Sequence, residues 1–160
     1  MAVPSDLVRW VNISLIKYFA SVADTNSITL YVEGVDERSE MTMNANHAEL
    51  RIQGPFIRNL SHNLWKVTCD VNIMLTVRMQ MASQNAYLIK DWGGIFVEAM
   101  ESAISVYKYG DGDALIDCLR VKLGRSDHID FFDFGIVNND TRIRQAEVDA
   151  TFEMTTTLGE

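Results

Sequence analysis

Apolar and polar side chains alternate over an unusually long stretch in the middle of the chain. From Trp65 to Gln80 every second residue is apolar, and the residues between them are polar except for Met74. This period of two predicts a β-strand with one buried face. Strands usually have only about 5–6 residues. At ~3.3 Å per residue this one would span roughly 50 Å, so we expect one end to project from a small domain.

Shorter strands are predicted in four places, each bounded by turn-forming or polar residues. They are Ile28–Val32, His47–Gln53, Ala114–Leu123 and Ala146–Thr155. Gly54–Pro55 is expected to end the second of these strands, and Gly110–Asp113 is the turn before the third. The polar stretch Glu33–Asn46 is expected to be a surface loop, and the aromatic, acidic segment Asp127–Val137 is ambiguous.

Two other segments repeat their apolar residues every three or four positions, which is typical of an amphipathic helix. The first runs from about Asp6 to Ala23 and the second from about Gln84 to Tyr107. Gly93 and Gly94 lie inside the second segment, where each costs helical stability on the order of 1 kcal/mol. We therefore expect close packing or a kink at this pair.

The order of elements is helix, strand, a pair of strands, helix and two strands. Neighbouring strands can pair as antiparallel hairpins, and two amphipathic helices can cover one face of the sheet. We therefore predict an α+β fold: a mostly antiparallel sheet with a long β-hairpin and both helices on one face. No repeat or linker divides the sequence, so residues 1–160 are expected to form a single domain.

Composition and charge narrow the classes of function. The chain has 22 acidic against 14 basic residues, a formal net charge of −8, which argues against affinity for a nucleic-acid backbone. No apolar run approaches the ~20 residues of a membrane helix, and the N-terminus lacks the features of a secretory signal. We expect a soluble protein, made in a reducing cytoplasm, that has no membrane partner.

Candidate chemistry is sparse. No motif for a nucleophile, a zinc site or a phosphate loop occurs. Asp127, His128, Asp130 and Asp133 could bind a divalent ion, but they lack the glycine and the terminal glutamate of a calcium loop, and a solvated acidic loop is the simpler interpretation. Cys69 is expected to be a buried hydrophobe and Cys118 to lie near the surface. We predict no catalytic residue, no metal and no cofactor.

What remains points to a protein that makes contacts. Basic residues, Arg51, Arg58, His62 and Lys66, are expected to surround Pro55–Ile57 at the tip of the long hairpin. Such a tip and its unpaired strand edges suit joints between subunits. The predicted partner-contact residues are Arg51, Pro55, Phe56, Ile57, Arg58 and His62, with Phe56 and Ile57 as apolar anchors. A flexible loop over a small hydrophobic cluster is the alternative.

Taken in order, these segments resemble a known family. They are the N-terminal helix and strand, the segment from His47 to Pro55, Leu64–Val67 at the start of the alternating strand, the turn Gly110–Asp113 after the second helix, and Thr141–Val148 at the entry to the last strand. In this order the chain resembles the tail terminators, or tail-completion proteins, of long-tailed bacteriophages.

The resemblance implies a homo-oligomeric ring, commonly a hexamer, on the head-proximal end of the tail tube in the virion. Such a ring stops tube polymerisation and docks to the neck of the DNA-filled head. The implied partners are further copies of the chain, the tail tube protein and a connector or stopper protein of the neck. DNA would only pass through the central channel, and the protein would be made in the cytoplasm of the bacterial host.

Within such a ring the acidic strand residues acquire a role. If Asp70, Glu147, Asp149 and Glu153 face the channel, they repel DNA weakly and let it slide; the alternative is that the acids only maintain solubility. Three other functions stay open: another neck or tube protein, a small metal-dependent enzyme that uses Asp127–Asp133, and an adaptor that recruits partners by strand addition.

Overall fold

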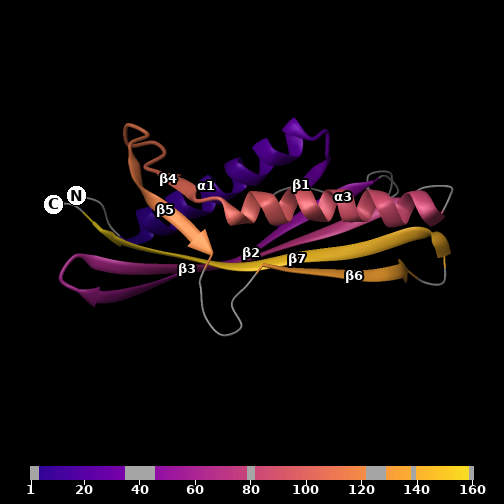
Figure 1. Cartoon of the computed structure of the whole chain (residues 1–160). Coiled ribbons are helices and arrows are strands. Elements are labelled where there is room, and N and C mark those ends of the chain that lie inside the picture. Colours follow the sequence, from indigo (N-terminus) through magenta and orange to yellow (C-terminus); the bar gives the residue numbers. More distant parts are fainter. Residues whose placement is uncertain (1–3, 35–45, 79–81, 122–128, 138–139, 159–160) are drawn as a thin grey trace.

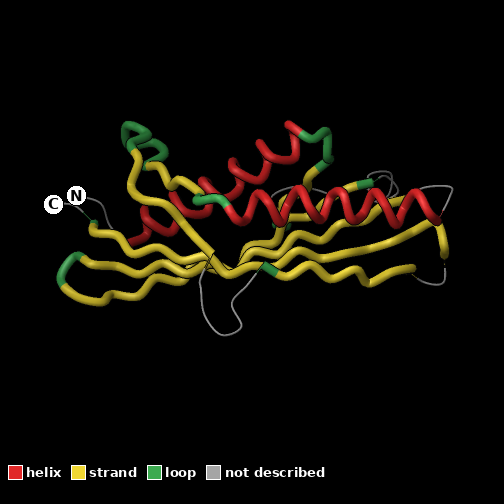
Figure 2. Tube along the Cα trace, viewed as in Figure 1, coloured by secondary structure: helices red, strands yellow, loops and turns green. Residues whose placement is uncertain are grey.

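The computed structural model describes residues 4–34, 46–78, 82–121, 129–137 and 140–158. Within them, two helices lie on the same face of a mostly antiparallel, strongly curled sheet (Figures 1 and 2), which confirms the predicted α+β class. The elements are α1 (Pro4–Thr25), β1 (Leu30–Val32), β2 (His47–Ser61), β3 (Leu64–Arg78), α3 (Ala82–Glu101), β4 (Ile104–Tyr107), β5 (Leu115–Val121), β6 (Asp130–Val137) and β7 (Asp140–Thr157).

The seven strands of these residues pair in the order β1-β2-β3-β7-β5-β4, with β6 also on β7. Of the strand pairs that the structure describes, only β1 and β2 run parallel. The long strand β7 has β3 along one side, while its other side pairs first with β6 and then, near Phe152, with β5. The central sheet is therefore made by the three longest strands, β2, β3 and β7.

Alternate residues of these strands close the core against the helices. On β3 the buried series includes Cys69, Ile73 and Leu75, and on β7 it includes Val148 and Phe152. Each helix contributes its stripe to the same cluster: Leu7, Trp10, Val11, Leu15 and Phe19 from α1, and Ile89, Trp92, Phe96, Ala99 and Met100 from α3. The sequence periodicities therefore predicted the buried residues both of the sheet and of the two helices.

Hydrogen bonds fix the position of α1. Trp10 Nε1 donates to the Tyr109 carbonyl at 3.0 Å, and Ser14 Oγ accepts from the Tyr107 N–H at 3.1 Å. The Tyr18 hydroxyl donates to the carbonyl of Ala99 in α3 at 2.5 Å. Because partly buried polar groups need partners, these bonds hold α1 against β4 and α3 in one orientation.

Gly93 allows α3 to approach the sheet closely. A Cβ atom at this position would lie 2.3 Å from the nearest ring atom of Phe131 in β6. Gly94, one residue on, faces open space. Of the two explanations for the glycine pair, close packing therefore holds for Gly93.

The predicted end of α3 is wrong. The helix ends at Glu101, and Ile104–Tyr107 form β4, which pairs with β5 through Ile104 and Leu119. Ile104 and Val106 are both buried, two residues apart, as a strand requires. Ile104 satisfied the helical spacing as well as the strand spacing, and pairing with β5 decided between the two.

The predicted end of β2 is also wrong. The strand runs through Gly54–Pro55 to Ser61, with a register shift against β3 between Gln53 and Phe56. An irregularity of this kind accommodates proline and glycine without ending a strand. The hairpin instead turns at His62 and Asn63, where Asn63 has a φ of 58°, a conformation that asparagine tolerates.

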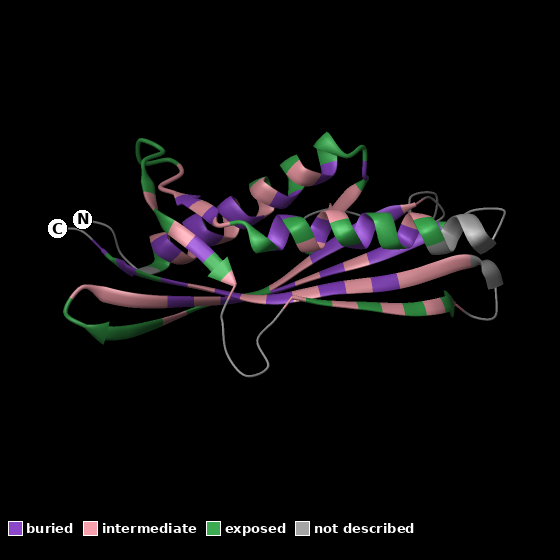
Figure 3. Cartoon of the chain, in the orientation of Figure 1, coloured by how far each residue is buried: buried purple, intermediate pink, exposed green. Residues whose placement is uncertain are grey.

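One end of the long hairpin projects, as its length predicted. The first four residues of β2 are buried, whereas Asn59 to Ser61 are all exposed, and Figure 3 shows this end of the hairpin as largely exposed or half-buried. Most of the predicted loop Glu33–Asn46 lies outside the described residues. None of the described helices is long and apolar enough to cross a membrane.

Candidate interaction surface on the helix-free face

The face of the sheet away from α1 and α3, called here the helix-free face, carries polar side chains in matched rows. One row holds Arg51, Asn72, Asp149 and Asp130, and the next holds Gln53, Asp70 and Thr151. These residues alternate with the buried series, so the period of two that predicted the core also places them together. This face also holds the four acids that were suggested from the sequence to face a channel: Asp70, Glu147, Asp149 and Glu153.

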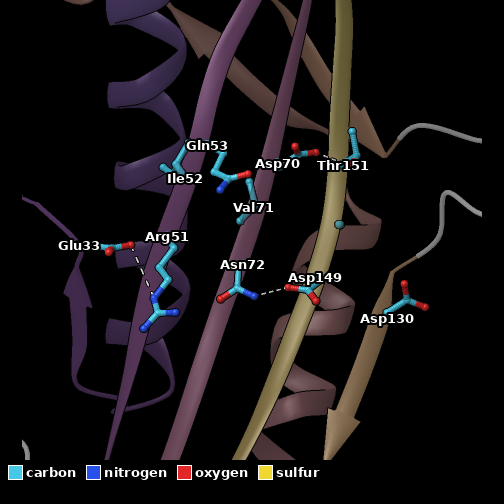
Figure 4. A pocket seen from close by; sticks show the side chains of 11 residues that line it. Glu33, Arg51, Ile52, Gln53, Asp70, Val71, Asn72, Asp130, Asp149 and Thr151 are labelled. Atoms are coloured by element: carbon cyan, nitrogen blue, oxygen red, sulfur yellow. Dashed lines mark hydrogen bonds and ion pairs between the residues drawn. The ribbon is translucent and has the colours of Figure 1, made fainter.

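These rows line a shallow groove of about 550 Å³ (Figure 4). Its charged residues are four carboxylates, Glu33, Asp70, Asp130 and Asp149, and one base, Arg51. Thr151 donates to Asp70 at 2.7 Å, and Asn72 donates to Asp149. The groove is therefore acidic, and it is held by hydrogen bonds between neighbouring strands.

Arg51 is not at the hairpin tip, contrary to the sequence expectation. It lies in the groove, where its Nε is 3.6 Å from Glu33 Oε2 and 3.5 Å from the buried Glu49 Oε1. Lys66, also expected at the tip, forms an ion pair with Glu153 at 3.3 Å. Both bases therefore offset acids of the helix-free face. Lys66 nevertheless lies opposite Arg58, as expected, so Arg58, His62 and Lys66 are the basic residues of the outer hairpin in the described part of the chain.

Glu147 and Asp149 are two carboxylates on the same side of β7. Burial raises the pKa of Glu147 to about 7, and its hydrogen bond and charge interaction with Asp149 act in the same direction, while Arg51 opposes them. One carboxylate ionises less readily beside another because like charges repel at short range. Glu147 is therefore partly protonated near neutral pH, and it contributes less negative charge than its residue type suggests.

The outer half of β2 presents most of the other predicted contact residues. Phe56 is 58% exposed, and Arg58 and His62 are exposed. Ile57 is half-buried and packs against the core, so it supports the strand and is less available as an anchor. Pro55 is half-buried beside the register shift.

Strand β6 holds surface residues that the sequence analysis missed. Phe132, Phe134 and Ile136 are 51%, 55% and 50% exposed, although all three are large and apolar. Alternation of exposed and half-buried residues runs through the whole of Asp130–Val137. That period of two could have predicted a strand. Because large apolar residues occupy the exposed positions, however, the sequence did not show which face of the strand is buried.

The described part of the candidate metal cluster, for which a solvated acidic loop was the simpler interpretation, is divided between two faces. Asp130 lines the groove, whereas Asp133 accepts from Arg144 at 2.8 to 3.1 Å. This bond is the main cause that lowers the pKa of Asp133. Asp127 and His128 lie outside the described residues. Among described residues, no three histidine, cysteine or acidic side chains are grouped so that they could hold a metal ion.

Cys69 lies in the core, as predicted, and Cys118 is half-buried. Burial is the main cause that raises the pKa of the Cys69 thiol to about 12. A thiol reacts mainly as the thiolate, so Cys69 is chemically inert in the folded chain.

Comparison with known proteins bears on the fold alone. No family model and no curated protein sequence matches the chain. A solved protein structure whose name states no function superimposes with a TM-score of 0.56, at 8% sequence identity, over 95% of this chain and 96% of its own. The arrangement of two helices on a curled sheet therefore recurs in a solved protein of matching extent.

Proposed function

We propose that the chain is the subunit of a ring that terminates the tail tube of a long-tailed bacteriophage and joins the tail to the neck of the head. The observation that carries the proposal is the one-sided sheet. Its long strands have helices on one face and an acidic, grooved surface on the other. A sheet covered on one side suits a subunit whose open face looks into a channel.

The acids then have a physical role. A wall that carries Asp70, Asp149 and Glu153 repels the phosphate backbone and lets DNA pass without binding. Lys66 and Arg51 offset part of this charge, so the repulsion is weak. Reversing the charge of Asp70 and Asp149 is expected to slow DNA ejection, and unchanged ejection kinetics would count against a channel-facing position.

The direct test measures assembly and capping together. Light scattering of the purified protein over a range of concentrations, with micrographs of the same sample, should reveal rings with a central hole. Purified tail tubes should bind the protein at one end only and stop growing. A protein that stays monomeric and leaves tubes unbound refutes the proposal; an adaptor that acts by strand addition would behave in that way.

A further inference from the structure

Besides its short end strands β1 and β4, the described part of the sheet has two open edges, at β6 and along the outer half of β2. Strand β6 pairs with β7 on one side only. Among the described residues, the last backbone hydrogen bond on the outer edge of β2 runs from the Glu33 N–H to the Leu50 carbonyl at 2.9 Å. From Gln53 to Ser61, β2 pairs with β3 alone. Open edges present backbone donors and acceptors that another strand can satisfy.

Both open edges carry exposed apolar side chains beside their charged residues, and exposed apolar side chains on an edge strand favour pairing with another chain. On β6 these are Phe132, Phe134 and Ile136; on β2 they are Phe56 and Leu60. Phe132 lies opposite Glu147, and Phe56 lies opposite Thr68, which is itself opposite Glu153. Phe132 and Phe56 therefore both belong to the helix-free face.

We infer that β6 of one copy pairs antiparallel with the outer half of β2 of a second copy, with Phe132 opposite Phe56 and Asp130 opposite Arg58. The inference rests on the ring of the proposed function and specifies its joint. Across β2, β3, β7 and β6 each strand runs antiparallel to its neighbour. A rotation about an axis inclined to the strands, as in a closed barrel, therefore brings β6 antiparallel to the next β2, and the sheet continues without a change in pattern.

A single register satisfies both the aromatic and the charged residues. With Phe132 set opposite Phe56, Asp130 falls opposite Arg58, two residues away on each strand and on the same face. Asp130 and Arg58 are both exposed, and neither forms an ion pair among the described residues. Aromatic pairs and opposite charges are the cross-strand combinations that favour one register. Because the acid and the base of this pair are both present on one chain, the strand that pairs with β2 is assigned to a second copy of the same chain.

The joint also offsets neighbouring subunits along the strands. Phe132 is level with Met74 of β3, whereas Phe56 is level with Thr68, six residues earlier in that strand. At ~3.3 Å per residue the offset is roughly 20 Å. Closing a sheet on itself requires such a stagger between strands. A head-to-tail joint of this kind closes into a ring when the rotation between copies permits it.

Charge reversal and its rescue test the joint. Arg58→Asp and Asp130→Arg should each weaken self-association about tenfold, measured by analytical ultracentrifugation, because like charges then face each other. The double variant should regain the wild-type association. Asp91→Arg, at an exposed acid on α3, makes the same charge change away from both edges and should have no effect. Singles without effect, or a double variant without rescue, overturn the joint.

Disulfide trapping tests the register. Chains that carry Phe56→Cys are mixed with differently tagged chains that carry Phe132→Cys, both in a Cys118→Ser background. A disulfide-linked heterodimer is expected, and replacing Phe56→Cys by Leu60→Cys should reduce its yield because position 60 lies four residues out of register. Tyr87→Cys, at a site 73% exposed on α3, controls for random collision. No heterodimer above that control, with or without tail tubes, overturns the joint.

These outcomes separate the joint from the proposed function. Rings that cap tubes without the 56–132 disulfide and without charge rescue leave the function standing and refute the joint. A disulfide and a rescue in a protein that never binds tube ends establish the joint and refute the function.

Discussion

The two faces of the sheet are made by alternate residues of the same strands, yet most of their residues differ in burial and in polarity. On β3, Cys69 and Ile73 are fully buried under the helices, whereas Asp70, between them in the period, is exposed. The strand backbone is common to both faces, so the difference comes from the side chains and from what covers them. A helix-covered face stabilises the fold, and a helix-free face is available for contacts.

The same contrast governs the carboxylates. Asp133 lies opposite the buried Ala146, on the helix-covered side, where the bond from Arg144 is the largest cause that lowers its pKa. Glu147 is the next residue after Ala146, on the helix-free face, where burial beside Asp149 raises its pKa to about 7. Asp133 therefore has a base as its main partner, whereas Glu147 lies beside another acid, although Glu153 on the open face does have Lys66 as a partner.

The largest expected difference between the faces is in core packing. Phe152→Ala on β7 should lower the free energy of unfolding by about 3–5 kcal/mol, because it removes a fully buried ring and leaves a cavity. Thr155→Ala, at an exposed position of the same strand, should stay within about 0.5 kcal/mol of the parent. Urea unfolding measures both, and equal effects would mean that the helices do not cover this face.

The glycine pair of α3 sharpens the comparison on a single helix. Gly93→Ala should cost about 1–3 kcal/mol, because the new methyl group meets the Phe131 ring. Gly94→Ala meets nothing within 4 Å and should stabilise the helix by about 0.5–1 kcal/mol, since alanine is the better helix former. Thermal unfolding that shifts both variants in the same direction would contradict the close approach of α3 to β6.

Removing the partner of Arg144 should have a smaller effect. Asp133→Asn is expected to cost about 1–2 kcal/mol at pH 7, because it breaks a partly buried charged hydrogen bond. The lowered pKa of Asp133 means that its stabilisation is present above the ordinary value of 3.8 and is lost as the pH falls through the folded value. The gap between variant and parent should therefore narrow below about pH 3.8. Asp91→Asn, at an exposed acid on α3, is the control and should be neutral.

The smallest effect concerns Glu147 on the open face, and its dependence on pH is the reverse of that of Asp133: stability falls as the pH rises. Because the pKa of Glu147 is raised from 4.5 to about 7, its contribution to stability is present below pH 4.5 and is lost as the pH rises through about 7. Allowing for solvent screening, the parent should lose about 1 kcal/mol from this group between pH 5 and pH 8. Glu147→Gln should lack that loss, while Glu98→Gln, on the exposed side of α3, should keep it. Urea midpoints measured from pH 5 to pH 8 test this, and an equal loss of stability in the parent and in Glu147→Gln would contradict it.

Elements whose hydrophobic pattern continues over many residues were predicted well from the sequence. The alternation from Trp65 and the helical stripe from Leu7 to Phe19 each repeat often enough to specify both an element and its buried side. Local signals near an element's end were less informative. Gly54–Pro55 suggested the end of a strand, but pairing with β3 on both sides of the irregularity carries β2 onward.

The candidate surface was predictable only in part. The period of two places Asp70 and Asp149 on one face without any knowledge of the fold. It does not reveal that Arg51 lies among those acids, because that position depends on the pairing of β2 with β3 and on the approach of Glu33. Nor does it reveal that β6 is an edge strand, where Phe132 becomes a surface residue.

The sequence by itself determined the class of elements, the side of each long element that is buried and the acidic character of the chain, because these depend on side-chain order along one segment. The tertiary structure alone decided where α3 gives way to β4, which acids obtain a base and which strand edges stay open. Those properties depend on contacts between segments far apart in the sequence, and the free energy of such contacts outweighs local preference.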